Sequence, residues 1–200
     1  MVSPKPVATK PTRPKVESSR LTRDDWLDAA FQAVVKGGFD HAKVLSLADA
    51  LGVTRGSFYW HFADHADLIK GLVERWLGRE MQINQQLQAD ALDDPQADLE
   101  KLLDAALEHA GVQLENMRFE LALRGLGRRN AEVAQMLADV DQMRMRLFET
   151  KFLRLTGDPK AASDLAALFY LAIVGSYQAL SRPNSTPQNK AYFKRIISSY

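Results

Sequence analysis

The sequence has 200 residues, of which 46% are apolar and 26% are charged, and its formal net charge is +1. A chain of this length can form one well-cored domain, or a small domain joined to a larger one. It contains no cysteine, which excludes disulfides, thiolate metal sites and redox sensing by cysteine. The absence of cysteine is also compatible with a reducing cytoplasm.

No part of the sequence has the pattern of an export signal or a membrane span. The N-terminus lacks the apolar core segment that signal peptides carry. The most apolar run, residues 165–174, covers ten positions, whereas a membrane helix needs about 20. We therefore expect a soluble, cytoplasmic protein with no membrane partner.

Residues 1–20 are expected to form a disordered basic arm. They carry five lysines and arginines against one glutamate, together with four prolines and no apolar periodicity. The arm is either a solubilising leader or a contact for DNA phosphates, and both interpretations remain open. Its net charge is +4, so the rest of the chain sums to −3. Any attraction for DNA must therefore come from the arm and from a local patch.

Helical structure is expected to begin at Thr22. The Thr22 hydroxyl can cap a helix, and Asp25 occupies the third helical position, as in a capping box. Apolar residues then recur at helical spacing, and Gly37 and Gly38 can end the helix in a left-handed conformation. The first helix is therefore predicted over about residues 22–36.

Residues 44–67 carry the pattern of a helix-turn-helix. A two-turn amphipathic helix is predicted to end at Gly52, and Thr54 is predicted to cap the helix that follows. On this second helix Phe58 and Phe62 are four residues apart and face inward, so polar and aromatic side chains occupy the other faces. Such an element places its second helix in a DNA major groove.

Every later periodic stretch is also helical. Asp64 and Asp67 are expected to cap a helix whose apolar stripe leads from the small domain into the larger one. Further helices are predicted at about 97–115, 116–124, 130–155, 162–181 and 188–199. The helix stops are assigned to Gly125, Gly127, 157–159 and 182–184.

The predicted fold class is all-α, because no strand-like alternation or hairpin signal appears. It comprises an N-terminal three-helix helix-turn-helix DNA-binding domain and a larger C-terminal helical domain. The expected boundaries are 1–20 for the basic arm, 21–66 for the DNA-binding domain and 67–200 for the larger domain.

The last two predicted helices indicate a homodimer. Residues 165–180 are apolar almost all round, and the final helix carries an apolar stripe opposite Lys190 and Lys194. These helices could cap their own domain, but two adjacent apolar helices are also what a two-fold four-helix interface requires. We favour the dimer because a helix-turn-helix usually binds paired half-sites. The expected interface residues are Leu168, Ala172, Tyr192 and Ile196.

Two patterns typical of metal binding or catalysis lack the context that such sites require. His61 and His65 have the spacing of two zinc ligands on one helix, but a cap at Asp64 would break that helix and no third ligand is near in sequence. Ser57 and His61 lack the strand-turn-helix context of a catalytic serine. We therefore expect no metal, no cofactor and no enzymatic activity.

Residues 22–77 resemble the DNA-binding domain of the TetR (tetracycline-repressor) family of bacterial transcriptional regulators. The matching blocks are Gly38-Phe39, residues 47–54, residues 56–62 and Asp67-Leu68. The resemblance implies a homodimer with a ligand cavity in its larger domain, and repression that an inducer relieves. Residues 80–200 are similar to the family only in their general helical layout.

The resemblance and the helical faces together predict the residues that contact DNA. Arg55, Gly56, Ser57 and Trp60 would face bases, with Arg55 able to bind guanine through two hydrogen bonds. Tyr59 and His61 would mostly hold phosphates, which position the protein without specifying sequence. The full predicted set is Lys43, Leu45, Thr54, Arg55, Gly56, Ser57, Tyr59, Trp60, His61 and His65.

Three positions depart from the family pattern. The hydroxyl residue common before the second helix is replaced by Lys43 or Val44, and Lys43 would compensate with a phosphate contact. His65 stands where family members commonly have a lysine at the start of the fourth helix. Because a histidine is largely neutral near pH 7, its grip on a phosphate would be weaker. Leu45 takes a position that is often polar and base-contacting in the family. The base-contacting surface is therefore expected to be narrower here.

An apolar small-molecule effector is expected to bind between the long helices of the larger domain. Methionine and aromatic residues there are more often plain core, but methionine suits adaptable apolar pockets. Ligand binding would shift the population so that the fourth helix pivots and the two DNA-contacting helices move apart. The candidate residues are Met117, Phe119, Met136, Met143, Tyr170 and Tyr177.

The sequence therefore predicts a ligand-responsive homodimeric repressor of a pseudo-palindromic double-stranded DNA operator. Two alternatives remain open. One is a regulator that works without an inducer, or that activates transcription. The other is a helical dimer that uses the helix-turn-helix as a protein-interaction module.

Overall fold

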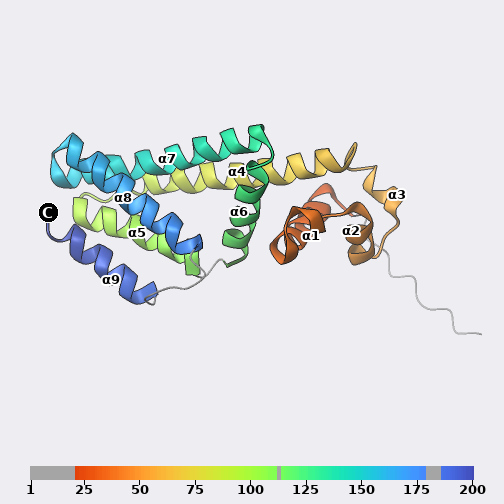
Figure 1. Cartoon of the computed structure of the whole chain (residues 1–200), viewed down its shortest axis with the longest axis horizontal. Coiled ribbons are helices and arrows are strands. Elements are labelled where there is room, and N and C mark those ends of the chain that lie inside the picture. Colours follow the sequence, from red (N-terminus) through yellow and green to blue (C-terminus); the bar gives the residue numbers. More distant parts are fainter. Residues whose placement is uncertain (1–20, 112–113, 179–185) are drawn as a thin grey trace, which may run out of the picture.

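A computed structural model of the protein describes residues 21–111, 114–178 and 186–200, and within them all regular structure is helical (Figure 1). The all-α prediction is confirmed. None of the helices in this part of the chain has the length and hydropathy needed to cross a bilayer. The helices are α1 (Arg23–Gly37), the 3-10 turn η1 (Phe39–His41), α2 (Val44–Leu51), α3 (Arg55–Phe58), α4 (His65–Ala89), α5 (Pro95–Gly111), α6 (Leu114–Gly127), α7 (Ala131–Thr156), α8 (Pro159–Gln178) and α9 (Thr186–Ile197).

The helix starts follow the capping signals in the sequence. Thr22 and Asp25 form the predicted capping box, each side chain accepting a hydrogen bond from the other residue's backbone N–H. The carboxylate of Asp64 accepts a hydrogen bond from the backbone N–H of Asp67 and so caps α4. Gly52 ends α2 in the left-handed conformation, with a φ of 69°.

Two local predictions are wrong. Thr54 precedes α3 but its side chain makes no capping hydrogen bond, and α3 is only four residues long before the chain enters a turn. Gly125 does not end α6, which continues to Gly127. A glycine inside a helix costs only about 1 kcal/mol, which the buried Phe119 and Leu123 on the same helix outweigh. The predicted stop at 182–184 lies outside the described residues.

The molecule is elongated, with α1–α3 at one end and α5, α8 and α9 at the other (Figure 1). The long helix α4 runs from the helix-turn-helix toward the other end, and α7 extends from that end as far as α6, which lies crosswise between the helix-turn-helix and the other helices. Buried side chains form two clusters. The proximal core joins α1–α4 to α6 and the first half of α7, and the distal core joins α5, the second half of α7, α8 and α9.

The proximal core does not stop where the predicted DNA-binding domain ends, between residues 66 and 67. Phe119 of α6 is fully buried and stacks on Phe31 of α1, with ring centroids 5.0 Å apart. Its ring also lies 5.7 Å from that of Phe39. The helix-turn-helix therefore packs directly on a helix of the larger domain. Because the contact is close-packed, a shift of α6 would also displace α1.

The outer side of α8 carries apolar side chains that are exposed in the described part of the chain. Residues that point to the distal core, such as Phe169, are buried, but Leu168 and Leu171 expose 58% and 68% of their surface. Ala172 is exposed as well. The adjacent part of α9 exposes Tyr192 and Ile196.

Candidate functional site

The orientation of α3 is set by two buried phenylalanines. Phe58 and Phe62 are almost fully buried, as predicted, and their rings stack with centroids 5.3 Å apart. Phe58 also meets Trp26 of α1 edge to face at 5.4 Å. Each aromatic pair of this kind contributes about 0.5–1.5 kcal/mol beyond the apolar area it buries. The short helix is therefore held by its aromatic core rather than by its length.

The opposite side of the same segment is exposed. Trp60 exposes 81% of its surface and Tyr59 exposes 52%. The Arg55 guanidinium donates a 3.0 Å hydrogen bond to the Tyr59 hydroxyl. Since the hydroxyl oxygen accepts this bond, the phenol hydrogen remains available for a phosphate oxygen. This interaction links the candidate base contact of Arg55 to the candidate phosphate contact of Tyr59.

The other predicted DNA-contacting residues surround this pair. Leu45, in the first turn of α2, is 62% exposed, and Lys43 directly before that helix is exposed too. Gly56 lies on the exposed side of α3, where an added Cβ would meet only the Thr54 hydroxyl, at 3.7 Å. Thr54 is likewise exposed, while Ser57 and His61 are half-buried.

His65 has a structural partner that the sequence did not indicate. Its Nε2 lies 2.8 Å from the carbonyl oxygen of Ala42, which can only accept, so Nε2 carries the donated hydrogen. The bond ties the first turn of α4 to the segment before α2. His61 and His65 lie on opposite sides of the Asp64 cap. No group of His, Cys, Asp and Glu suited to a metal ion occurs among the described residues.

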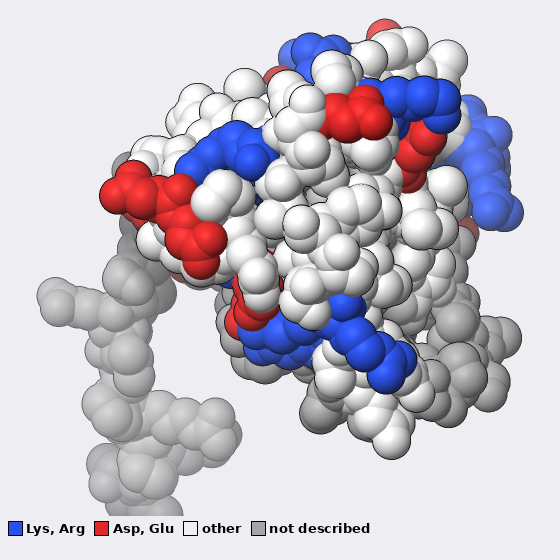
Figure 2. Space-filling model, turned by 90° about the vertical axis from the view of Figure 1, so that its left-hand side faces the viewer, with Lys and Arg blue, Asp and Glu red and all other residues white. Residues whose placement is uncertain are grey.

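Charge is not concentrated around the helix-turn-helix. Residues 21–65 contain four lysines and arginines against six aspartates. At the end of the molecule farthest from the helix-turn-helix, basic and acidic side chains are interspersed around an uncharged area (Figure 2). Acidic residues therefore outnumber basic ones in the segment that contains the helix-turn-helix.

The larger domain contains a small cavity between α4, α5, α7 and α8, with a volume of about 90 Å³. Its surface is mostly apolar, and four polar residues contribute to it: Glu80, Asn84, Arg144 and Tyr170. Of the six predicted ligand contacts only Tyr170 is among the lining residues. Phe119, Met136 and Met143 belong to the proximal core instead, Met117 lies half-buried on α6, and the side chain of Tyr177 is outside the described residues.

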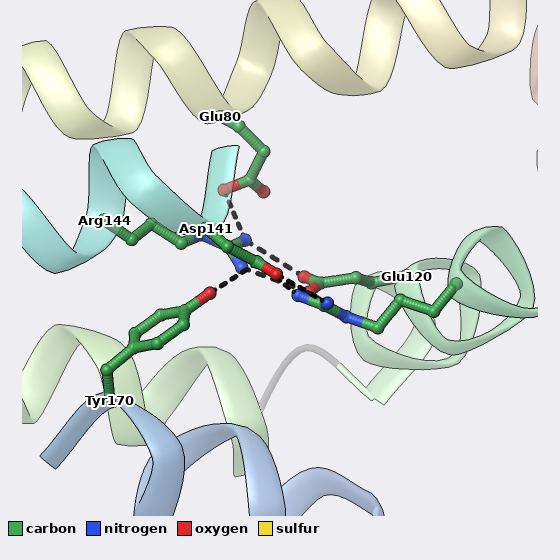
Figure 3. Close-up of polar contacts among 6 residues, drawn as sticks. Glu80, Glu120, Asp141, Arg144 and Tyr170 are labelled. Atoms are coloured by element: carbon green, nitrogen blue, oxygen red, sulfur yellow. Dashed lines mark hydrogen bonds and ion pairs between the residues drawn. The ribbon is translucent and has the colours of Figure 1, made fainter. Parts of the chain in front are cut away.

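A buried network of charges adjoins this cavity and joins four helices (Figure 3). The Arg144 guanidinium lies between two carboxylates, 2.7 Å from Glu80 of α4 and 3.0 Å from Glu120 of α6. The Arg124 guanidinium contacts Glu120 at 2.7 Å and Asp141 of α7 at 2.6 Å. Asp141 also accepts a 2.6 Å hydrogen bond from the hydroxyl of Tyr170, on α8.

The network shifts the pKa values of Glu120 and Tyr170 strongly. Burial alone would raise the pKa of the Glu120 carboxyl, but the charges and hydrogen bonds of Arg144 and Arg124 outweigh burial and lower that pKa to about 2. Burial and the hydrogen bond to Asp141 raise the pKa of Tyr170 to about 12, against the opposing charge of Arg144. Glu120 is therefore ionised, and Tyr170 is neutral, near pH 7.

Glu80, Asn84 and Arg144 were not predicted as site residues from the sequence. Glu80 and Asn84 continue the four-residue spacing of Leu68, Leu72 and Trp76 along α4, and all five are buried. A polar residue on an otherwise apolar helical stripe is the signal that could have identified them.

The fold and the exposed aromatic and basic face define the class of the protein, an all-α helix-turn-helix protein. Residues 27–72 match the family model described as bacterial regulatory proteins, tetR family. The chain is 36% identical over 58 residues to the HTH-type transcriptional regulator TtgR of Pseudomonas putida, a match covering 29% of this chain and 28% of the relative. It is 32% identical over 92 residues to the regulator AcrR of Shigella flexneri, covering 46% and 43%.

The fold extends beyond these matches. A transcriptional regulator from Saccharomonospora viridis, solved in complex with choline, superposes with a TM-score of 0.71 over 88% of this chain and 95% of that one, at 16% identity. Aligned segments span less than half the length of TtgR and AcrR. The match to the tetR family model is confined to residues 27–72, which contain the helix-turn-helix.

Proposed function

We propose that the protein is a DNA-binding transcriptional regulator that inserts α3 into the major groove of an operator. The observation that carries this proposal is the separation of faces on residues 55–62. Phe58 and Phe62 are buried, whereas Tyr59 and Trp60 are exposed on the segment that also carries Arg55. A folded monomer gains nothing from an indole that exposes 81% of its surface, so an external partner is the simplest reason for it.

Each contact has a distinct role in this proposal. Arg55 donates two hydrogen bonds to a guanine, and Trp60 packs against a thymine methyl group. Tyr59 and Lys43 hold phosphates and so set the position of α3 on the duplex. Because α3 is short, the base-contacting surface is confined to residues 55–60 and to Leu45 of α2.

The uncovered face of α8 and α9 supports a homodimer. Leu168, Ala172, Tyr192 and Ile196 are exposed in one chain, and a second copy related by a two-fold axis would bury all four. The dimer would hold two copies of α3 about 34–36 Å apart, the spacing of successive major grooves on one side of DNA. Repression would follow where such an operator overlaps a promoter.

The cavity supports regulation by a small molecule. Helix α4 begins at His65, beside the helix-turn-helix, and reaches the cavity at Glu80, about 22 Å further along its axis at 1.5 Å per residue. A ligand that favours one position of α4 would therefore shift the population of α3 spacings. The choline complex of the Saccharomonospora viridis protein indicates that this fold accommodates effectors.

Binding to the DNA upstream of the protein's own gene, titrated with salt, tests the proposal. We expect affinity at least ~10³-fold above that for random DNA. Weak binding that is blind to sequence and disappears with salt would contradict it.

Substitutions of the exposed residues Arg55 and Tyr59 distinguish a DNA-binding regulator from a protein-interaction module. Arg55→Ala and Tyr59→Phe should weaken operator binding while the dimer stays intact, because both side chains are exposed. Loss of the dimer in these variants would instead support the use of the helix-turn-helix as a protein-interaction module.

A further inference from the structure

We propose that the cavity between α4, α5, α7 and α8 binds a compact, mostly apolar molecule with one oxygen acceptor, such as a short ketone or ester, and that the side-chain amide of Asn84 selects for this acceptor. The inference names the class of effector, so its regulatory consequence rests on the proposed function. The binding itself is independent of DNA and can be measured without an operator.

Asn84 is a buried amide with an unused donor group. It exposes only 6% of its surface and lines the cavity. Its side-chain oxygen accepts a 2.7 Å hydrogen bond from the Nε2 of Gln88, one turn later on α4. Within the described part of the chain its NH2 group donates to no acceptor. Because a buried donor without a partner destabilises a protein, we infer that the partner of this group is a ligand.

The stability of the fold favours an apolar residue at this position. Asn84 continues the stripe of α4 that buries Leu72 and Trp76, where an aliphatic side chain of the same size would pack without an unpaired polar group. The hydrogen bond to Gln88 joins residues four apart on one helix, and such pairs stabilise a helix only slightly. Burial of the unpaired NH2 group outweighs this gain. Recognition of a ligand is therefore the better explanation for the amide.

The neighbouring polar groups on the cavity wall already bind protein partners. The Arg144 guanidinium donates hydrogen bonds to two carboxylates. The hydroxyl of Tyr170 is directed at Asp141 and donates its hydrogen to that carboxylate at 2.6 Å (Figure 3). The NH2 group of Asn84, in contrast, can bind an acceptor without the loss of any hydrogen bond among the described residues.

The cavity limits the size and the polarity of the ligand. An apolar cavity of about 150 Å³ in another protein accommodates benzene, whereas this one has a volume of about 90 Å³. Most of its wall is aliphatic or aromatic, for example Leu147, Phe148 and Ile173. A group smaller than benzene, with hydrocarbon on most sides and one oxygen directed at Asn84, fits such a wall.

The regulatory consequence follows from the helices that the ligand would contact. Its oxygen would bind Asn84 on α4, while its hydrocarbon part would pack against residues such as Phe148 of α7 and Ile173 of α8. A bound molecule would therefore favour one position of α4 relative to α7 and α8. Since α4 begins beside the helix-turn-helix, occupancy would hold α4 away from the position that the operator requires and lower the affinity for DNA.

Two uncharged probes of nearly the same shape test the need for an acceptor. Cyclobutanone carries a carbonyl oxygen, and methylenecyclobutane carries a CH2 group in its place. Ligand-detected NMR gives the Kd of each probe for the full-length protein and for Asn84→Leu, whose side chain has a similar shape but no polar group. We expect the ratio of the alkene Kd to the ketone Kd to be at least about fivefold larger in the unaltered protein. Differences in the hydration of the probes cancel from this comparison.

A control variant and a second readout complete the test. Gln85→Leu removes an amide from the adjacent, exposed position on α4, and it should keep the ratio of the unaltered protein. In that protein, cyclobutanone should also shift the proton signals of the Asn84 NH2 group downfield, and methylenecyclobutane should not. This second readout decides should Asn84→Leu fail to fold.

Three results would overturn the inference. The first is a ratio that agrees within about twofold between the unaltered protein and Asn84→Leu. The second is an equal shift of the Asn84 NH2 signals by both probes. The third is the absence of cyclobutanone binding at millimolar concentrations.

Operator binding with and without cyclobutanone separates this inference from the proposed function. A ketone that weakens operator binding in the unaltered protein but not in Asn84→Leu supports both. A ketone that binds a protein without a specific operator supports the cavity and contradicts the regulator. A specific operator together with failure of the ketone to bind contradicts only the cavity. A specific operator whose affinity the bound ketone leaves unchanged contradicts the regulatory consequence.

Discussion

At Gly56 the helix-turn-helix carries a residue that its own fold does not require. The position has no left-handed φ, and an added Cβ would meet only the Thr54 hydroxyl, at an ordinary contact distance of 3.7 Å. Alanine also has the higher helix propensity, by about 1 kcal/mol. The reason for a glycine at this exposed site is therefore to be sought outside the chain, in the close approach of α3 to DNA.

We accordingly expect Gly56→Ala to leave the melting temperature unchanged or slightly higher, while the affinity for the operator falls by about tenfold or more. The added methyl group would occupy space that the protein leaves to a base edge or a phosphate. Thermal unfolding and operator titration measure the two effects separately. As a control, Gly78→Ala lies at an exposed position on α4 where an added Cβ meets nothing within 4 Å, and it should leave operator affinity intact. Unchanged affinity in Gly56→Ala would contradict the proposed orientation of α3.

At the scale of the elements, Glu120 makes the buried network sensitive to acid. Its pKa is about 2 in the folded protein, against an ordinary value of 4.5. A carboxyl whose pKa is lowered by folding stabilises the protein at pH values above 4.5, and this stabilisation is lost as the pH falls toward 2. The difference corresponds to roughly 3 kcal/mol, because each pKa unit is worth about 1.4 kcal/mol.

In Glu120→Gln the loss of folding stability at acid pH should be smaller. The free energy of unfolding of the unaltered protein should decrease between pH 4.5 and 2 by roughly 3 kcal/mol more than that of the variant. Near neutral pH the variant should be less stable, because Arg124 and Arg144 lose a shared anion. Denaturant unfolding across this pH range provides the measurement. Glu74→Gln, at an exposed position on α4, serves as the matched control, and an acid dependence that is identical in all three proteins would contradict the assignment to Glu120.

Local signals explain which elements the sequence could predict. The capping box at Thr22, the left-handed Gly52 and the Asp64 cap each depend on residues within one turn, and each is found in the structure. The inward position of Phe58 and Phe62 follows in the same way from helical spacing. The short length of α3 was not predictable from spacing, because the hydrogen bonds of a turn replace those of a helix after Phe58 without a change in the residue pattern.

The cavity depends on relations that no local pattern contains. Its wall combines residues of α4, α5, α7 and α8, and their register follows only from how the helices pack. Residue type alone therefore predicted Phe119, Met136 and Met143 as ligand contacts. These side chains instead fill the proximal core next to α1. The polar members of the wall, such as Asn84, were visible in the sequence only as interruptions of an apolar stripe.

At the scale of the whole molecule, the uncovered apolar side chains of α8 and α9 predict how two chains associate. Leu168 is 58% exposed on α8, so a charge there would cost the single chain little but would be buried unpaired in a two-fold interface. We expect Leu168→Lys to fold normally and to raise the dimer dissociation constant by at least about tenfold. Sedimentation at several protein concentrations measures this change. Leu153→Lys places the same charge on α7 at a side chain that is 42% exposed, and it should remain dimeric.

The monomeric Leu168→Lys protein should also lose most of its operator affinity, because the two α3 helices would no longer be held at the half-site spacing. A monomer that retains full affinity would contradict a dimeric operator complex.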